Sequence, residues 1–196
     1  MRKALLLLAL FWVTVSMAQE HPAETADLPG ITDAPPGGDF MLHSGDRTFS
    51  LKDYRGKVVL LYFGYTKCPD VCPTSLSYMA QAFNDLKDEE LKKAVGVFVS
   101  VDPKRDTRDL LDEYVDYFHP NFIGVTGTEK EIADAAALYG AQYYEVELEG
   151  SAFGYAVNHS AATYLIAPDG EMRFIFPHNT SPEVITEAVR YVLDGY

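Results

Sequence analysis

Apolar residues follow two kinds of pattern between residues 40 and 196. Short continuous runs of apolar and β-branched residues are typical of buried strands, whereas apolar residues spaced three and four apart are typical of helices that face a core. The runs predict strands at residues 40–42, 48–51, 58–63, 95–101, 143–148, 162–166 and 172–176. The helical spacings predict helices at residues 73–93, 107–118, 128–139 and 181–193.

Residue-specific signals support several of these elements. Thr128 and Glu131 have the spacing of a capping box at the start of a helix, and Gly140 follows the end of that helix. The sequence Pro168-Asp169-Gly170 predicts a turn, so we expect the strands on either side of it to pair antiparallel. The helix over residues 107–118 is predicted to turn four residues to one side: Leu110, Leu111, Tyr114 and Tyr117.

The order of these elements predicts the fold class. Strands and helices alternate, and one strand pair is antiparallel, which is typical of an α/β fold with a mixed central sheet flanked by helices. Residues 58–63 are apolar without a break, as expected for a central strand buried on both faces. Residues 43–46 have the composition of a turn, so residues 40–51 are predicted to form an N-terminal hairpin.

The first eighteen residues have the pattern of a signal peptide. A basic start, Arg2-Lys3, precedes an apolar run over residues 4–15 and the small-residue site Ser16-Met17-Ala18. The run is shorter than the roughly 20 residues of a membrane span. We therefore predict cleavage after Ala18, a flexible tail over residues 19–39, and an exported, periplasmic domain over residues 40–196. The alternative is a domain tethered to the membrane by an uncleaved anchor.

Length and charge restrict the classes of function. The chain has 196 residues, of which 47% are hydrophobic, enough for one domain with its own core. Its formal net charge is −13, and removal of residues 1–18 makes it more negative by the loss of two basic residues. Such a surface is a poor partner for nucleic acid. We expect a monomer that does not bind nucleic acid.

The two cysteines of the chain, Cys68 and Cys72, follow the predicted strand at residues 58–63. Such a pair can form a disulfide, exchange one with a partner, or bind a soft metal. A disulfide between them closes a very small loop and contributes on the order of 2 kcal/mol, compared with about 4.7 kcal/mol for a 100-residue loop. A functional dithiol is therefore a better interpretation than a structural disulfide.

A cysteine pair between a strand and a helix is a thioredoxin-like placement. The spacing here is Cys-x-x-x-Cys, however, and not Cys-x-x-Cys. His159 precedes the strand predicted at residues 162–166, and in a thioredoxin-like sheet the loop that enters this strand lies beside the cysteines. Two thiolates and one imidazole suit copper, whereas a structural zinc site takes four protein ligands. Spacing alone leaves His159 open as an ordinary polar residue, and thiol exchange stays open too.

Five sequence blocks, which occur in family order, carry a resemblance to a known family. They are Gly64-Tyr65-Thr66-Lys67-Cys68-Pro69-Asp70-Val71-Cys72-Pro73, Val99-Ser100-Val101-Asp102-Pro103-Lys104-Arg105-Asp106-Thr107, Phe118-His119-Pro120-Asn121-Phe122-Ile123-Gly124-Val125-Thr126-Gly127, Tyr155-Ala156-Val157-Asn158-His159-Ser160 and Tyr164-Leu165-Ile166-Ala167-Pro168-Asp169-Gly170. The chain from about residue 40 to its end resembles the Sco/SenC family.

The resemblance implies a thioredoxin-like fold and one copper ion, Cu(I) or Cu(II), held by Cys68, Cys72 and His159. It implies delivery of copper to the binuclear copper centre of a cytochrome c oxidase, with the oxidase subunit or another copper chaperone as partner. The alternative is a thiol–disulfide reductase, in which Cys68 and Cys72 are the catalytic dithiol and the partner is a disulfide. Asn158 is a departure, because the family usually has Asp there.

Other residues are weaker candidates. Asp70 lies between the cysteines and could act outside the ligand set, and Tyr65 could line the site. Three residues after a predicted strand could shape a partner face or form local turns and caps: Asp102, Arg105 and Asp106. Three histidines are interpreted as ordinary loop residues: His43, His119 and His178. After cleavage, the new terminus Gln19-Glu20-His21 could bind Cu(II) or Ni(II) in a square plane.

Overall fold

A computed structural model describes residues 36–44, 46–150 and 154–195. The predicted signal peptide and nearly all of the predicted tail, including His21, lie outside this part of the chain.

The strands are β1 (Met41–Ser44), β2 (Arg47–Ser50), β3 (Val58–Gly64), β4 (Ala94–Ser100), β5 (Phe122–Val125), β6 (Tyr143–Glu147), β7 (Tyr155–His159), β8 (Thr163–Ile166) and β9 (Met172–Phe176). The helices are η1 (Leu51–Tyr54), α1 (Val71–Asn84), α2 (Asp88–Leu91), α3 (Arg108–Phe118), α4 (Glu129–Tyr139) and α5 (Pro182–Leu193). Within the described ranges, no helix is both long and apolar enough to cross a bilayer.

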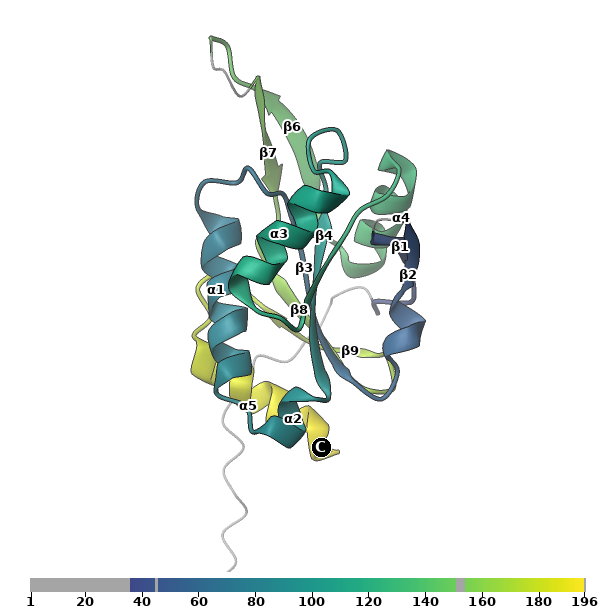
Figure 1. The fold of residues 1–196 in the computed structure, drawn as a ribbon, viewed down its shortest axis with the longest axis vertical. Helices are drawn as coiled ribbons and strands as arrows, with labels where there is room; N and C mark the ends of the chain where they lie inside the picture. Colours follow the sequence, from purple (N-terminus) through teal and green to yellow (C-terminus); the bar gives the residue numbers. More distant parts are fainter. Residues whose placement is uncertain (1–35, 45, 151–153, 196) are drawn as a thin grey trace, which may run out of the picture.

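The central sheet has the strand order β5-β4-β3-β8-β9 (Figure 1). Strands β3, β4 and β5 run parallel, while β8 is antiparallel to β3 and to β9. This arrangement is the predicted mixed sheet, and β3 is its central strand. All seven residues of β3 are buried. Tyr62 faces one side of the sheet and stacks on Phe98, whereas Phe63 faces the other side and contacts Tyr139 and Tyr164.

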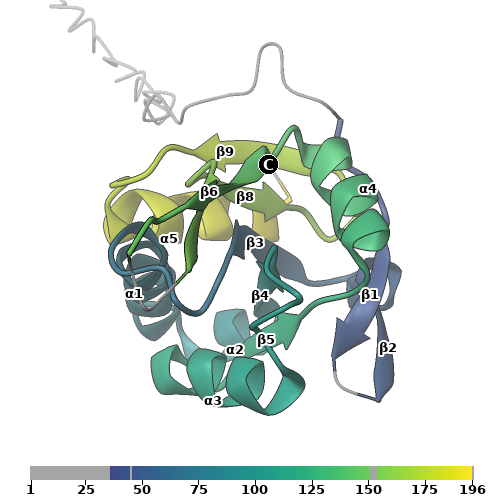
Figure 2. The same cartoon turned by 90° about the horizontal axis from the view of Figure 1, so that it is seen from above.

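Helices cover both faces of the sheet (Figure 2). Helices α1, α3 and α5 lie on one face, and α4 lies on the other beside β1 and β2. The predicted N-terminal hairpin is present as β1 and β2, and backbone hydrogen bonds between His43 and Thr126 attach it to the end of β5. Strands β6 and β7 form a separate hairpin that extends beyond the end of the central sheet (Figure 1).

Two sequence predictions on one side of the sheet are corrected. The helix predicted over residues 73–93 is interrupted after Asn84, and a second short helix begins at Asp88. Asn and Asp at positions 84 and 85 favour helix ends, and Glu90 accepts a hydrogen bond from the backbone N–H of Lys87 to start α2. The prediction that Tyr117 shares the buried side of α3 is wrong, because its side chain is 85% exposed and Leu111 and Val115 face the core.

Two strands were not predicted. Strand β5 is only four residues long and contains Gly124, so its apolar run is too short to stand out. The sequence places His159 in the loop that enters the strand predicted at residues 162–166, but His159 is the last residue of strand β7, which pairs with β6. The predicted strand at residues 143–148 is present as β6, although it pairs outside the central sheet. His159 therefore sits at the end of a hydrogen-bonded strand and not in a loop.

Candidate metal centre

The two cysteines lie where the central strand gives way to helix α1. Strand β3 ends at Gly64, a short loop carries Cys68, and Cys72 lies in the first turn of α1. The backbone N–H of Cys68 donates to the carbonyl of Tyr65 over 3.2 Å, which closes the loop. Cys72 is fully buried and Cys68 is 9% exposed, and no disulfide joins them. Any reagent or partner therefore reaches the pair from the side of Cys68.

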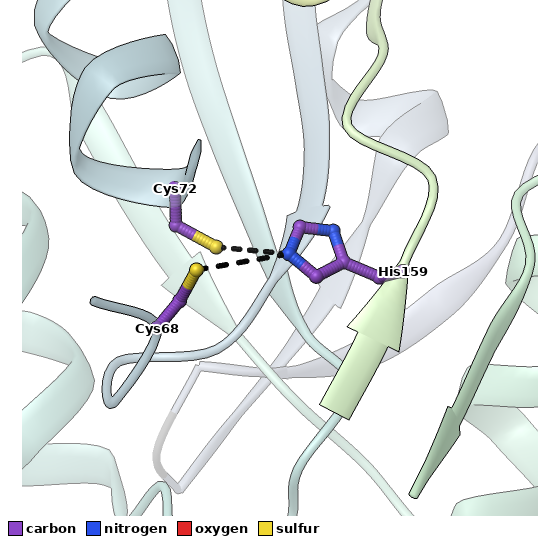
Figure 3. Close-up of side chains that lie close together, drawn as sticks. All are labelled: Cys68, Cys72 and His159. Atoms are coloured by element: carbon purple, nitrogen blue, oxygen red, sulfur yellow. Dashed lines mark hydrogen bonds between the residues drawn. The ribbon is translucent and has the colours of Figure 1, made fainter. Parts of the chain in front are cut away.

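His159 completes a group of three ligand atoms (Figure 3). Its Nε2 atom lies 3.2 Å from the Cys72 sulfur and 4.0 Å from the Cys68 sulfur. Its Nδ1 atom lies 3.2 Å from the carbonyl oxygen of Ser160. With its proton on Nε2 the ring donates to the sulfurs, whereas with its proton on Nδ1 it donates to that carbonyl and leaves the Nε2 lone pair for a metal, which is the tautomer that a metal ligand needs.

The donor set fits a soft metal. The two sulfurs and the imidazole nitrogen lie within 4.8 Å of one another, and this group is the one His/Cys/Asp/Glu cluster with metal-binding spacing among the described residues. Thiolate ligands select soft ions such as Cu(I), and imidazole also accepts Cu(II). The sequence predicted that His159 lies beside the cysteines, and the structure brings these three side chains together.

The two thiols differ in their electrostatic surroundings. The hydrogen bond from Cys72 lowers the pKa of Cys68, and the hydrogen bond from His159 and the backbone N–H groups of Asp70 and Cys72 act in the same direction. Burial raises the pKa of Cys72, and the neighbouring Cys68 thiolate raises it further. These opposite shifts favour the proton on Cys72 and the negative charge on the more exposed Cys68 sulfur.

Two tyrosine rings hold the imidazole in place. Tyr62 and Tyr65 both meet His159 edge-on, with ring centroids 6.0 and 5.9 Å away. Burial is the largest cause that raises the pKa of each phenol, so both stay neutral near pH 7. The prediction that Tyr65 lines the site agrees with this geometry, and Tyr62 is a further wall residue that sequence reasoning did not single out.

Gly64 leaves space for a sulfur atom. A Cβ at this position would lie 2.7 Å from the Cys72 sulfur, 2.9 Å from the Phe98 ring and 3.0 Å from the Tyr62 ring. Real Cβ atoms do not approach neighbours this closely, so any larger residue has to displace the buried sulfur or one of the rings. The end of β3 thereby fixes where Cys72 can lie.

We predict that Gly64→Ala destabilises the reduced protein by about 1–3 kcal/mol and also weakens metal binding, because the added methyl group overpacks the site. Denaturant unfolding and metal titration measure the two effects. Gly96→Ala is the matched control, since its Cβ would overlap the Phe122 ring one strand away. The control is expected to lose stability and keep its metal affinity; a Gly64→Ala protein with unchanged metal affinity would contradict the prediction.

Three of the weaker candidates do lie near the site, in supporting positions. Asp106 accepts hydrogen bonds from Thr66, two residues before Cys68. Asp102 and Arg105 contact Tyr155 at the start of β7. None of the three caps α3, whose N-cap residue is Thr107. Sequence reasoning missed their partners, because Thr66 and Asp106 are forty residues apart and no local pattern links them.

The remaining candidates lie apart from the three ligand atoms. His119 is buried against Phe83 and Phe122, and its pKa is lowered by burial. His43 faces Glu131, and His178 contacts Ser75. The prediction of ordinary loop residues holds for His178 but is wrong for His43, which lies in strand β1, and for His119, which is buried at the end of α3.

Two polar residues next to the ligands face outward. The Asp70 side chain is exposed. Asn158 precedes His159 and is exposed as well, and its amide donates a hydrogen bond of 2.9 Å to the hydroxyl of Tyr144 on β6. Asn158, where the resemblance leads us to expect Asp, therefore forms a contact within the β6–β7 hairpin and adds no ligand.

The fold and the site define a thioredoxin-like protein with a Cys₂His centre. The SCO1/SenC family model matches residues 30–194. The SCO2-like protein of Rickettsia conorii is 37% identical over 155 residues, which are 79% of this chain and 75% of that protein. The mitochondrial SCO2 homolog of Homo sapiens is 35% identical over 201 residues, with 97% of this chain and 75% of that protein covered. The structure of Arabidopsis thaliana ScoI with copper bound is similar with a TM-score of 0.75, at 37% identity over 82% of this chain and 99% of that one. The chain belongs to the SCO1/SenC family.

Proposed function

We propose that this chain is an exported copper chaperone that binds one copper ion through Cys68, Cys72 and His159. The observation that carries the proposal is the meeting of three soft-metal ligand atoms within 4.8 Å, contributed by the loop after β3, helix α1 and strand β7. The copper-bound Sco relative has the same fold and supports copper as the metal. The ion is the cargo of the protein, so the site has to release it as well as hold it.

The ligands suit both oxidation states of copper. The two thiolates provide the soft sulfur donors that Cu(I) prefers, and the imidazole supplies the nitrogen donor that stabilises Cu(II). Oxidation of Cys68 and Cys72 to a disulfide removes both sulfur ligands, so copper occupancy and disulfide formation exclude each other. A reduced pair is therefore required before the protein can take up copper.

The direction of delivery follows from exposure. Cys68 is the more exposed of the two sulfurs, so an incoming thiolate from a partner replaces the Cys68 sulfur before the Cys72 sulfur and draws the ion outward by ligand exchange. Sco proteins take part in the assembly of cytochrome c oxidase. The proposed acceptor is the subunit that holds the binuclear copper centre of such an oxidase, or a second copper chaperone, outside the cytoplasm.

The asymmetry of the two thiols favours a second function, thiol–disulfide reduction. The Cys68 thiolate would attack one sulfur of a target disulfide and expel the other as a thiolate, which takes up a proton. Cys72 would then lose its proton and attack Cys68 in the mixed disulfide, which releases the second target thiolate and leaves Cys68 and Cys72 oxidised. The lowered pKa of Cys68 supplies the nucleophile for the first step.

Two transfer experiments with one acceptor separate these functions. In the first, reduced protein loaded with one Cu(I) is mixed with the reduced, copper-free soluble domain of an oxidase copper subunit, and the copper in each protein is measured after separation. In the second, reduced copper-free protein is mixed with the same domain in its disulfide form, and new thiols are counted. His159→Ala is included in both, because the imidazole is a proposed copper ligand but only a smaller contributor to the lowered pKa of Cys68.

Copper found in the acceptor after the first experiment, with a slower or incomplete transfer from His159→Ala, is the result expected of a chaperone. Thiols that appear in the second experiment at similar rates with and without His159 are the result expected of a reductase. A wild-type protein that retains no copper through separation would overturn the chaperone proposal.

A further inference from the structure

A short segment after strand β4 concentrates buried polar residues beside the metal centre. Ser100, Asp102 and Asp106 are three of the seven buried polar or charged residues in the described part of the chain. Buried polar groups need partners, and burying a carboxylate is costly unless it is paired or hydrogen-bonded. The hydrogen-bond and ion-pair partners of this segment, residues 100–106, therefore indicate which parts of the chain it holds in place.

Asp106 holds the loop that carries Cys68. One of its carboxylate oxygens accepts hydrogen bonds from the backbone N–H of Thr66 at 2.9 Å and from the hydroxyl of Ser100 at 2.6 Å. The other oxygen accepts a bond of 2.6 Å from the Thr66 hydroxyl. Asp106 is 1% exposed, so these bonds have no competition from water. The residue two positions before Cys68 is thereby fixed to the end of strand β4.

Arg105 holds the strand that carries His159. Its guanidinium forms a largely buried ion pair with Asp102 and donates a hydrogen bond of 2.8 Å to the backbone carbonyl of Tyr155. It also lies over the Tyr155 ring, 3.7 Å from the ring centroid, while the Tyr155 hydroxyl donates to Asp102 over 2.7 Å. Tyr155 is the first residue of β7, and His159 is the last.

We propose that residues 100–106 position both halves of the metal centre, with Asp106 fixing the loop that carries Cys68 and Arg105 fixing the strand that carries His159. The two contacts start from neighbouring residues of one segment, so they set the sulfur-bearing loop and the imidazole-bearing strand relative to a common point at the end of β4. The effects that we expect on copper binding rest on the proposed function, whereas the contacts themselves do not involve a metal.

The two residues are expected to affect copper differently. Loss of the Asp106 contacts loosens the loop that holds the Cys68 sulfur, which both oxidation states of copper need. Loss of the Arg105 contact shifts the start of β7 and hence the imidazole, which Cu(II) needs more than Cu(I) does. Residues that orient metal ligands through hydrogen bonds change metal affinity about 10–100-fold when they are replaced.

Three variants test these roles. Asp106→Ala removes all three hydrogen bonds, whereas Asp106→Asn keeps one oxygen and offers an NH₂ group to the Thr66 hydroxyl, which can accept as well as donate. Arg105→Lys keeps a positive charge beside Asp102 and loses the planar contact with Tyr155. Thr66→Val is a milder version of Asp106→Ala, in case the alanine variant does not fold.

Two matched controls lie far from the metal centre. Arg190 resembles Arg105, since it pairs with Glu90 and donates to the carbonyl of Asp85, so Arg190→Lys is the control for Arg105→Lys. Asn121 makes two hydrogen bonds to the carbonyls of Leu91 and Ala94, and Asn121→Ala is the control for Asp106→Ala. Both controls remove contacts between separate segments without touching the loop or β7.

The measurements are Cu(I) affinity against a calibrated chelator, Cu(II) affinity and its electron paramagnetic resonance spectrum, and amide hydrogen exchange of the reduced, copper-free protein. Asp106→Ala is expected to bind both ions about 10–100-fold more weakly and to exchange faster in the loop 65–70. Asp106→Asn is expected to recover most of the copper affinity and most of the protection from exchange.

Arg105→Lys is expected to bind Cu(II) at least about tenfold more weakly, with an altered spectrum, faster exchange over Tyr155–His159 and unchanged Cu(I) affinity.

Hydrogen exchange keeps this inference separate from the proposed function. If the wild-type protein does not bind copper, the proposed function fails, while local changes in exchange still support the positioning roles. If the Asp106 and Arg105 variants exchange like their Asn121 and Arg190 controls, or change the loop and β7 equally, the positioning inference is overturned whatever the copper titrations show.

Discussion

Replacing Cys68 and Cys72 together by alanine is expected to abolish Cu(I) binding. Structural zinc sites with four ligands bind Zn²⁺ with about 10–16 kcal/mol, so on that scale one ligand contributes on the order of 3 kcal/mol, or about 100-fold in affinity. Loss of both sulfurs therefore reduces the affinity by about 10⁴-fold or more. Each single cysteine variant is expected to lose about 100-fold.

His159→Ala is expected to weaken copper binding too, with the larger loss for Cu(II). The imidazole nitrogen lies 3.2 and 4.0 Å from the two sulfurs and is the one non-sulfur donor of the cluster. Without it, Cu(II) is left with two thiolates that it can oxidise, whereas Cu(I) keeps both of its preferred ligands. The expected results are a marked loss of Cu(II) affinity and a smaller loss of Cu(I) affinity.

The titration is done on the reduced protein with a calibrated competing chelator for each ion. His178→Ala is the matched control for His159→Ala, because it removes a partly exposed imidazole that contacts Ser75 and no sulfur. His21→Ala controls for copper bound at the predicted new N-terminus. Full Cu(II) affinity in His159→Ala, or one tight Cu(I) in the double cysteine variant, would show that the ligand set is wrong.

Local patterns in the sequence were sufficient for most of the fold. The strand β3 could be predicted because it is apolar on both faces, and α4 because Thr128, Glu131 and Gly140 define its ends. These features depend on neighbouring residues, so they can be read without knowing the fold. The cysteine pair was recognised for the same reason, since both residues lie within one turn of the β3–α1 junction.

Contacts between distant segments could not be predicted in this way. Strand β7 is only partly buried, and it pairs with β6 outside the central sheet, so its sequence carries no continuous apolar run that predicts a strand. Thr66 and Tyr155 have no local signature, and their importance appears only when Asp106 and Arg105 reach them. The three residues that meet at the candidate metal centre could be predicted from the sequence, whereas the residues that place them required the structure.

Cys68 is expected to react with iodoacetamide far faster than Cys72 in the reduced, copper-free protein. Cys68 is 9% exposed and Cys72 is fully buried, so alkylation of Cys72 needs local opening around the start of α1. Opening of a packed first helical turn makes the reaction slower by on the order of 100-fold. Peptide mass spectrometry at early times is expected to find the label on Cys68 almost alone.

The pH dependence of this reaction follows from the lowered pKa of Cys68. Only the thiolate reacts, and an ordinary thiol loses reactivity about tenfold per pH unit below about 8.5. The pKa of Cys68 lies below that value, so its thiolate persists as the pH falls and its rate is expected to stay level from about pH 8 to about pH 6. The rate falls only when the pH passes the lowered pKa.

Cys72→Ala tests the cause of that lowered pKa. The hydrogen bond from Cys72 is its largest source, so this variant is expected to shift the rate profile of Cys68 toward higher pH. His159→Ala removes a smaller contribution and is expected to shift the profile less. If neither variant moves the profile, or if Cys68 behaves as an ordinary thiol in the unmodified protein, the proposed distribution of charge over the pair is wrong.

The same distribution of charge bears on the choice between the two proposed functions. A rapid reductase needs Cys72 to lose its proton readily and resolve the mixed disulfide, but burial and the neighbouring thiolate raise the pKa of Cys72. A copper ion takes the place of that proton and offsets the charge of both sulfurs at once, so copper binding does not meet the obstacle that slows resolution. A mixed disulfide at Cys68 that persists in the copper-free protein would therefore favour copper handling over thiol exchange, whereas its rapid resolution would favour the reductase.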